Sequence, residues 1–271
     1  ADDLRALAAA IAAARRDGRE VLIGIGAHVI KCGLSPWLVA LMEERLITGV
    51  AMNGAGAVHD FELAYGGATS EDVGPALEDG TFGMVRETAD FLNGAAADAA
   101  LEGKGFGEAL GEAILGERLK HRGLSVCAAG ARLGVPVTVH VAMGTDIVHM
   151  HPSASGAAIG EASLRDFHRF AERVRRLERG VYLNAGSAVI LPEVFLKALA
   201  MARNRSKGGA PRRFTTANLD FIPAYRPLTN VVRRPTTRGG TGYQIIGHHE
   251  LLLPLLFTAV REEMARGKGR R

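Results

Sequence analysis

Strand-like and helix-like segments alternate along most of this chain, and that alternation limits the possible folds more than any other feature. Short apolar runs occupy residues 20–27, 49–56, 135–143, 180–190, 213–222 and 242–247. Helical patterns lie between them, such as the apolar spacing of residues 3–16 and the Ser35–Pro36 helix start. Strands that alternate with helices favour right-handed strand–helix–strand units. The sequence therefore predicts an α/β fold with a doubly wound, mainly parallel, Rossmann-like sheet.

Residues 69–123 interrupt this alternation. The segment is rich in acidic residues, glycine and alanine, and it contains no strand candidate. The strands on either side resume the same pattern, so a separate domain is disfavoured. We expect a helical insertion that covers one end of the sheet or packs on a neighbouring subunit. Residues 1–271 would then form a single α/β domain of the NAD-binding type.

The composition argues against several kinds of partner and location. No apolar run reaches the ~18 residues that a membrane-spanning helix needs. The chain has only two cysteines, Cys32 and Cys127, so a disulfide framework is absent and a cytoplasmic location is expected. The net charge is +4, but the arginine-rich segment 226–240 lacks the interleaved aromatic residues that bind single-stranded nucleic acid. We therefore expect a small-molecule partner, and neither membrane nor nucleic acid.

The predicted strands end in loops of small residues, and this is where a doubly wound sheet binds its ligands. The loops read GIGAHVIKCG (24–33), MNGAGAVHDFE (52–62), GTDIVHMHP (144–152) and NAGSAVILPE (184–193). Bare backbone N–H groups at helix starts bind anions, as in a nucleotide pyrophosphate pocket. The first loop lacks the third glycine of the G-x-G-x-x-G fingerprint. The residues predicted to contact a cofactor are Gly26, Ala27, His28, Asn53, Gly54, Gly56, Asp146, Asn184, Gly186 and Ser187.

Histidines gather on the same loops and supply candidate catalytic groups. His149, His151 or His59 could act as a general base, and Asp146 could orient that base or contact a ribose. The His-x-His spacing also puts two imidazoles on one side of an extended segment. An alternative is therefore a metal site built from His140, His149 and His151. Polar contacts to an organic ligand are favoured over a bound metal.

Taken together, these segments resemble the deoxyhypusine synthase family. GAHVIKCGL and MNGAGAVHDF are similar to two of its cofactor loops, and GTDIVH stands where the family has an Asp-Gly loop. LNAGSAVILPEVFLKA stands where a Gly-Gly-Gly loop leads into a substrate-contacting helix. The resemblance implies an NAD pocket, and a homotetramer with sites at subunit interfaces.

Two departures from the family pattern bear on the reaction. GYQI places Gln244 where the family has its catalytic lysine, and a primary amide cannot form the required imine. The family's acidic polyamine-binding stretch is basic here, with Arg226, Arg233, Arg234 and Arg238. Arginines suit a carboxylate or phosphate. The resemblance thus implies the fold and the NAD pocket without deoxyhypusine formation.

The sequence leads to one main hypothesis and two alternatives. The main hypothesis is an NAD-binding enzyme, an oxidoreductase or an NAD-dependent transferase or lyase, that acts on a small anionic substrate. Its substrate contacts would be Arg233, Arg234, His248 and Glu193. The first alternative is a metal-dependent lyase or hydrolase that uses the histidine cluster. The second is a non-catalytic nucleotide-binding protein.

Overall fold

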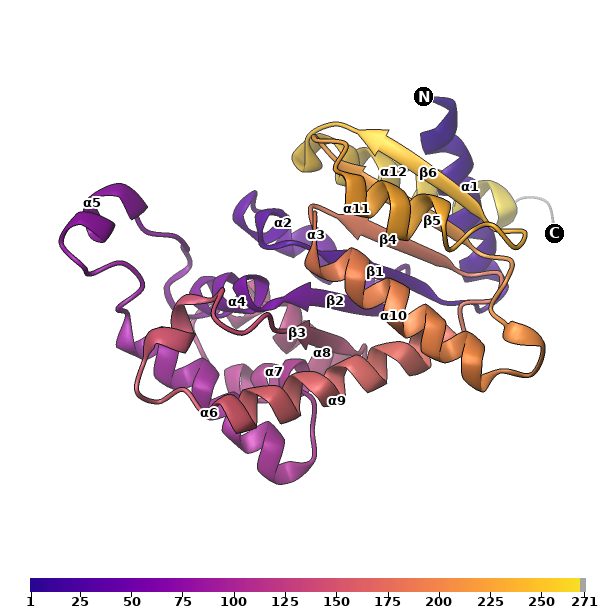
Figure 1. The fold of residues 1–271 in the computed structure, drawn as a ribbon. Helices are drawn as coiled ribbons and strands as arrows, with labels where there is room; N and C mark the ends of the chain where they lie inside the picture. Colours follow the sequence, from indigo (N-terminus) through magenta and orange to yellow (C-terminus); the bar gives the residue numbers. More distant parts are fainter. Residues whose placement is uncertain (269–271) are drawn as a thin grey trace.

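The computed structural model describes residues 1–268, and six parallel strands form one sheet at its centre (Figure 1). The strands are β1 (Val21–Ile25), β2 (Gly49–Asn53), β3 (Val137–His140), β4 (Val181–Ala185), β5 (Thr215–Asp220) and β6 (Thr241–Ile246). Their order is β3-β2-β1-β4-β5-β6, and every neighbouring pair is parallel. The predicted α/β class with a doubly wound sheet is confirmed. The order reverses between β1 and β4, which is the switch point at which such sheets bind ligands.

Helices surround this sheet on both faces. They are α1 (Asp2–Arg16), α2 (Ala27–Lys31), α3 (Ser35–Glu43), α4 (Gly54–Gly66), α5 (Val73–Glu78), α6 (Arg86–Glu102), α7 (Phe106–Gly116), α8 (Val126–Leu133), α9 (Gly156–Arg175), α10 (Ile190–Arg205), α11 (Tyr225–Pro227) and α12 (His249–Lys268). Short helical turns are η1 (Arg122–Leu124), η2 (Ile147–Met150), η3 (Lys207–Gly209) and the π-helical η4 (Leu228–Arg233). In Figure 1, α9 and α10 cross in front of the sheet, whereas α1 and α12 lie behind it.

Alternation of side chains along the buried strands builds a core on each face. All five residues of β1 are buried. Leu22 packs in the cluster under α9 and α10, whereas Ile23 and Ile25 pack in the cluster that includes α1, α3 and α12. Successive strand side chains point to opposite faces, so a strand covered on both sides needs an unbroken apolar run. The Val-Leu-Ile run of the sequence meets that need.

The chain between β2 and β3 forms helices only. Within residues 69–123 these are α5, α6, α7 and the start of η1. Helix α6 packs against α7 and α9, whereas α5 has no buried residue and projects away from the sheet (Figure 1). The assignment of residues 1–271 to a single domain stays a prediction. No helix of the described part combines the length and the apolar character needed to span a bilayer.

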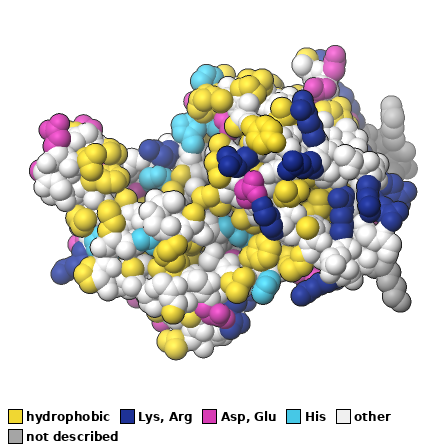
Figure 2. Space-filling model, viewed as in Figure 1, with side chains coloured by type: hydrophobic (Ala, Val, Ile, Leu, Met, Phe, Trp, Pro, Cys, Tyr) yellow, Lys and Arg dark blue, Asp and Glu magenta, His cyan; other side chains and the backbone are white. Residues whose placement is uncertain are grey.

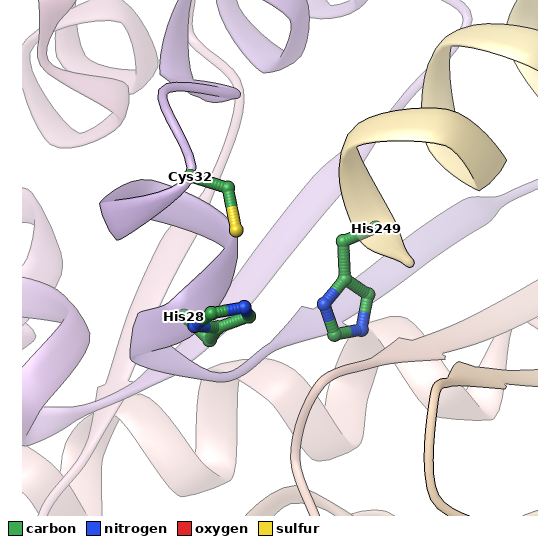
Figure 3. A group of neighbouring side chains, drawn as sticks. All are labelled: His28, Cys32 and His249. Carbon is green, nitrogen blue, oxygen red and sulfur yellow. The ribbon is translucent and has the colours of Figure 1, made fainter. Parts of the chain in front are cut away.

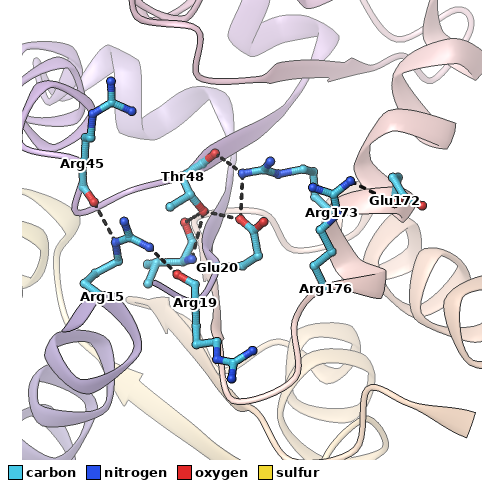
Figure 4. A network of polar contacts seen from close by, with 9 residues as sticks. Arg15, Arg19, Glu20, Arg45, Thr48, Glu172, Arg173 and Arg176 are labelled. Carbon is cyan, nitrogen blue, oxygen red and sulfur yellow. Dashed lines mark hydrogen bonds and ion pairs between the residues drawn. The ribbon is translucent and has the colours of Figure 1, made fainter. Parts of the chain in front are cut away.

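A polar network closes the amino edge of the sheet (Figure 4). The Glu20 carboxylate accepts hydrogen bonds from Arg173 Nη2 at 2.8 Å and from Thr48 Oγ1 at 2.6 Å. Arg173 also donates to the backbone oxygen of Thr48 at 2.9 Å. These contacts join the starts of β1 and β2 to the end of α9. The opposite, carboxyl edge carries the loops with titratable side chains.

We predict that Tyr182→Phe stabilises the protein by about 1 kcal/mol. The Tyr182 ring stacks on Phe195 with centroids 3.9 Å apart, but its hydroxyl is buried without a partner among the described residues. Removing an unpaired buried hydroxyl relieves its desolvation cost and keeps the stacking. Urea unfolding of both proteins measures the difference. A loss of more than about 1 kcal/mol would reveal a hydrogen-bond partner for the hydroxyl, such as a buried water.

Candidate functional site

The carboxyl ends of β1 and β4 meet at two glycines. The Gly26 N–H donates to the Ala185 carbonyl at 2.9 Å, and a Cβ on Gly26 would lie 2.0 Å from the Gly186 oxygen. Gly186 has a φ of +67°, a conformation that side chains disfavour. Both positions therefore require glycine for packing. Two of the predicted cofactor residues thus lie together at the switch point, beside Ala27 and His28 at the start of α2.

The loops after β2 and β3 meet where α4 begins. Asn53 caps α4 through its Oδ1, which accepts from the Gly56 N–H at 3.0 Å. A Cβ on Gly54 would lie 1.9 Å from Asp146 Oδ2, so glycine makes room for that carboxylate. Burial raises the pKa of Asp146, and contacts with His149 and with hydrogen-bond donors oppose this effect. Asp146 therefore occupies the anion position at the start of α4, which leaves no space for a phosphate there.

A pocket of about 450 Å³ opens beside this junction; we call it the β2 pocket because it lies at the carboxyl end of β2. Its walls come from α2, α4, the segment before α6 and the loop after β3. The charged residues and histidine lining it are Lys31, His59, Glu62, Glu71 and Asp146, and its apolar lining includes Val58, Phe82, Val85 and Ile147. Two predicted catalytic residues, His59 and Asp146, therefore share one cavity.

His59 is held in one tautomer by its neighbours. Its Nδ1 lies 3.2 Å from Glu62 Oε2 and also within hydrogen-bond distance of Thr69 Oγ1. The Thr69 hydroxyl donates to the same Glu62 oxygen, so both partners accept from His59. Burial alone would raise the pKa of Glu62, but the hydrogen bonds from His59 and Thr69 lower it below its usual value. With the proton on Nδ1, the basic nitrogen of neutral His59 is Nε2.

The other two predicted catalytic histidines bond to backbone atoms, His149 within its own loop and His151 to the segment before α6. His149 Nδ1 accepts the backbone N–H groups of Gly144 and Asp146, each at 3.2 Å. His151 Nε2 donates to the Gly83 carbonyl at 2.9 Å. Neither is among the residues that line the β2 pocket. These bonds fix the shape of the loop, so this placement favours a structural role for both residues.

The alternative metal site is not assembled. His140 is buried, bonds through Nε2 to Thr138 Oγ1 at 3.0 Å, and has its pKa lowered to about 3 by burial. Within residues 1–268, the ligand atoms of His140, His149 and His151 form no close group of three. This arrangement argues against the alternative ligand set, because His149 and His151 lie on a helical turn and its exit, where backbone groups occupy their rings.

On the β4 side, an amide ladder crosses three strands. Asn184 Nδ2 donates to Asn218 Oδ1 at 2.7 Å, and Asn218 Nδ2 donates to Gln244 Oε1 at 3.1 Å. Asn184 also donates to the Ser187 carbonyl, while Ser187 Oγ accepts from the Leu191 N–H. Asn184 and Ser187 therefore shape the turn after β4. Gln244 is part of β6.

Arg233 and Arg234 of the basic segment lie away from this edge. The Val232 carbonyl is 2.2 Å from the Cβ position of Gly242, the second residue of β6, so Arg233 follows at the amino ends of the strands. Arg234 donates to Asn230 Oδ1 at 3.0 Å. On this face most Lys and Arg side chains gather on the right, whereas histidines lie mainly towards the left and centre (Figure 2). The placement argues against the predicted substrate role of Arg233 and Arg234.

Glu193 is also occupied, since its carboxylate contacts Lys197, Arg226 and Asn230 on the surface of α10. His248, the last predicted substrate contact, remains at the carboxyl edge. It is exposed, and its ring stacks on Phe221 with centroids 5.9 Å apart.

A second group of side chains on this edge was not predicted. His28, Cys32 and His249 approach one another from α2 and α12, and all their ligand atoms lie within 4.8 Å of one another (Figure 3). Lys31 was expected to be a surface side chain at a helix start; it is exposed and also lines the β2 pocket. The available signals were the spacing of His28 and Cys32 on a helix start and the tandem histidines before α12. Only strand order, however, brings those two segments together.

Comparisons with known proteins show the fold. No protein-family model matches the chain, and no curated protein matches it. The AgrE ternary complex with ornithine and NAD+ has a TM-score of 0.61 and 14% identity, over 97% of this chain and 33% of AgrE. A conserved putative LOR/SDH protein from Methanococcus maripaludis S2 has a TM-score of 0.62 and 15% identity, over 96% of this chain and 68% of that protein.

A putative deoxyhypusine synthase from Entamoeba histolytica has a TM-score of 0.50 and 12% identity, over 89% of this chain and 74% of that protein. At such identities the likeness extends to the fold alone. The predicted fold relation to deoxyhypusine synthase is confirmed, and membership of that family stays a prediction. The chain spans about a third of the length of AgrE.

Proposed function

We propose that this chain is an NAD-binding enzyme that acts on a small substrate of the amino-acid type, which carries a carboxylate group. The observation that carries this proposal is the β2 pocket, which holds a histidine–glutamate pair on the ligand-binding edge of a sheet with order β3-β2-β1-β4-β5-β6. AgrE, whose fold is similar, has been solved with ornithine and NAD+. That complex supports the proposed ligand classes.

The switch point fits a dinucleotide. The β1 and β4 loops present Gly26, Ala27 and Gly186 there, so backbone can approach a cofactor closely. We place the cofactor along this rim rather than at the start of α4, because Asp146 occupies that position. When bound, NAD+ would supply hydride acceptance.

The residues of the pocket would bind the substrate and move a proton. The exposed Lys31 ammonium lies at the mouth and would bind a carboxylate. His59 Nε2 would accept the proton of a substrate hydroxyl or amine, while Glu62 stabilises the imidazolium through Nδ1. Asp146 would orient the substrate through its buried carboxyl group.

Calorimetric titration tests the proposal, with NAD+ and ornithine as the first probes. We expect saturable binding of both, and we expect Lys31→Met to weaken ornithine binding about tenfold or more while NAD+ affinity stays unchanged. A charge-assisted hydrogen bond to the carboxylate is lost in that variant. Lys120→Met is the matched control, because Lys120 is exposed and does not line the β2 pocket.

Absence of heat and of thermal stabilisation at millimolar NAD+ would refute the proposal. Incubation with NAD+ and a panel of α-amino acids tests the enzymatic part. If both ligands bind but neither NADH formation nor loss of any amino acid follows, the chain is a binding protein instead.

A further inference from the structure

His28, Cys32 and His249 form a group of potential metal ligands separate from the β2 pocket. His28 lies in the first turn of α2 and Cys32 directly follows α2, four residues later, so both side chains lie on one face of the helix. His249 is the first residue of α12, and its ring lies beside the side chains of the other two residues (Figure 3). We propose that these three side chains bind a divalent transition-metal ion, with zinc as the best match.

The orientation of His249 supports this inference. Its ring is fully buried, and Nε2 lies 3.1 Å from the Leu219 carbonyl, which can only accept. Nε2 therefore carries the proton, and the lone pair of neutral His249 is on Nδ1. A backbone carbonyl that fixes the tautomer in this way is typical of metal-binding histidines.

His249 Nδ1 is also buried without a hydrogen-bond partner among the described residues. An unpaired buried polar atom costs about 1–3 kcal/mol, so native proteins rarely keep one without a reason. The local packing holds the ring in place: a Cβ on Gly186 would lie 2.9 Å from His249 Cε1. A metal ion bound to His249 Nδ1 would accept its lone pair and remove this cost.

The donor set selects the kind of ion. Two imidazoles and a thiolate suit zinc and exclude hard cations, which prefer oxygen. Tetrahedral bonds of about 2.0–2.3 Å separate neighbouring ligand atoms by about 3.3–3.8 Å. The three ligand atoms lie within 4.8 Å of one another. Rotation of the side chains that moves these atoms by about 1 Å would bring them to the spacing of a tetrahedral site.

The Glu250 carboxylate contacts the Cys32 thiol beside this group. The three protein ligands leave a fourth position, and His28 is exposed to solvent. An open position of this kind is typical of catalytic rather than structural zinc sites. The site borders Gly186, at the rim where we place the cofactor. The assignment makes His28 a metal ligand instead of the cofactor contact expected from the sequence, and it does not depend on NAD binding.

Cobalt titration of the chelator-treated chain tests the site. We expect one Co²⁺ per chain with a thiolate-to-cobalt charge-transfer band, and displacement by Zn²⁺. Cys32→Ser should remove the band, and both Cys32→Ser and His28→Ala should weaken zinc binding at least about tenfold. His248→Ala is the matched control, since His248 is an exposed neighbour outside the group.

His28 is exposed, so its replacement keeps the core intact even if a His249 variant fails to fold. The inference is overturned if cobalt binds without a thiolate band, if neither variant changes zinc affinity, or if no metal binds. NAD+ titration of the same samples separates the two proposals: intact NAD+ binding without metal binding would remove only this one.

Discussion

The wild-type protein is expected to lose about 4 kcal/mol of its free energy of unfolding as the pH rises towards 7, and Asp166→Asn should abolish this loss. Asp166 is fully buried on α9, and its Oδ2 accepts the backbone N–H groups of Val139 at 2.8 Å and Gly107 at 2.9 Å. Burial raises the pKa of Asp166 from 3.8 to about 7. Its Oδ1 has no partner among the described residues.

The sign follows from proton binding. Between pH 3.8 and about 7 the folded state keeps the proton on Asp166, whereas the unfolded chain has lost it. The folded state binds more protons over this window, so stability falls as pH rises. Burial also raises the pKa of Asp60 and of Asp146, and their effects have the same direction.

Urea unfolding from pH 4.5 to pH 8, at steps of about one pH unit, measures the slope for the wild type and the variant. The asparagine side chain would keep an oxygen for the two N–H groups without the buried charge, so Asp166→Asn should be the more stable protein at pH 8. Asp98→Asn, on the exposed face of α6, controls for the loss of one negative charge. Equal slopes for Asp166→Asn and the wild type would contradict the prediction.

Asp60→Ala should destabilise the protein by about 3–5 kcal/mol. The Asp60 carboxylate is fully buried and accepts three hydrogen bonds at the start of α8: from Ser125 Oγ at 2.6 Å, the Val126 N–H at 2.7 Å and the Cys127 N–H at 3.1 Å. Alanine would leave these donors unpaired in the core, where each costs about 1–3 kcal/mol.

Denaturant unfolding at fixed pH measures this effect. Asp60→Asn is the matched variant, because its remaining oxygen still accepts from α8, and it should lose less than half as much stability as Asp60→Ala. A loss below about 1 kcal/mol for Asp60→Ala would show that water replaces the carboxylate at the helix start.

Local sequence patterns were sufficient to predict the fold class. Buried parallel strands must be apolar throughout, and helices repeat their apolar residues every three or four positions, so both can be read from neighbouring residues. The same alternation predicts that ligands bind at the carboxyl edge of the sheet. His59 and Asp146, placed on two different loops, were therefore predicted to meet, and they line one pocket.

Roles within the loops were not predictable in this way. His149 and His151 have the same side-chain chemistry as His59, but hydrogen bonds with Gly144, Asp146 and Gly83 fix them within the loop. The bonds of His149 depend on the exact backbone turn of its own loop, and the bond of His151 depends on Gly83, which is 68 residues away in the sequence. The placement of Arg233 and Arg234 also disfavours the predicted substrate role, because η4 runs back towards the amino ends of the strands.

The sequence by itself determined the alternating elements and the glycines at the strand ends, because burial imposes a short-range period on side chains. Only the tertiary structure decided which side chains share a site. His28 and Cys32 meet His249 because β1 lies next to β4, and β5 and β6 follow in order. These segments are close in space because of the order of the strands in the sheet, and local sequence periodicity does not encode that order.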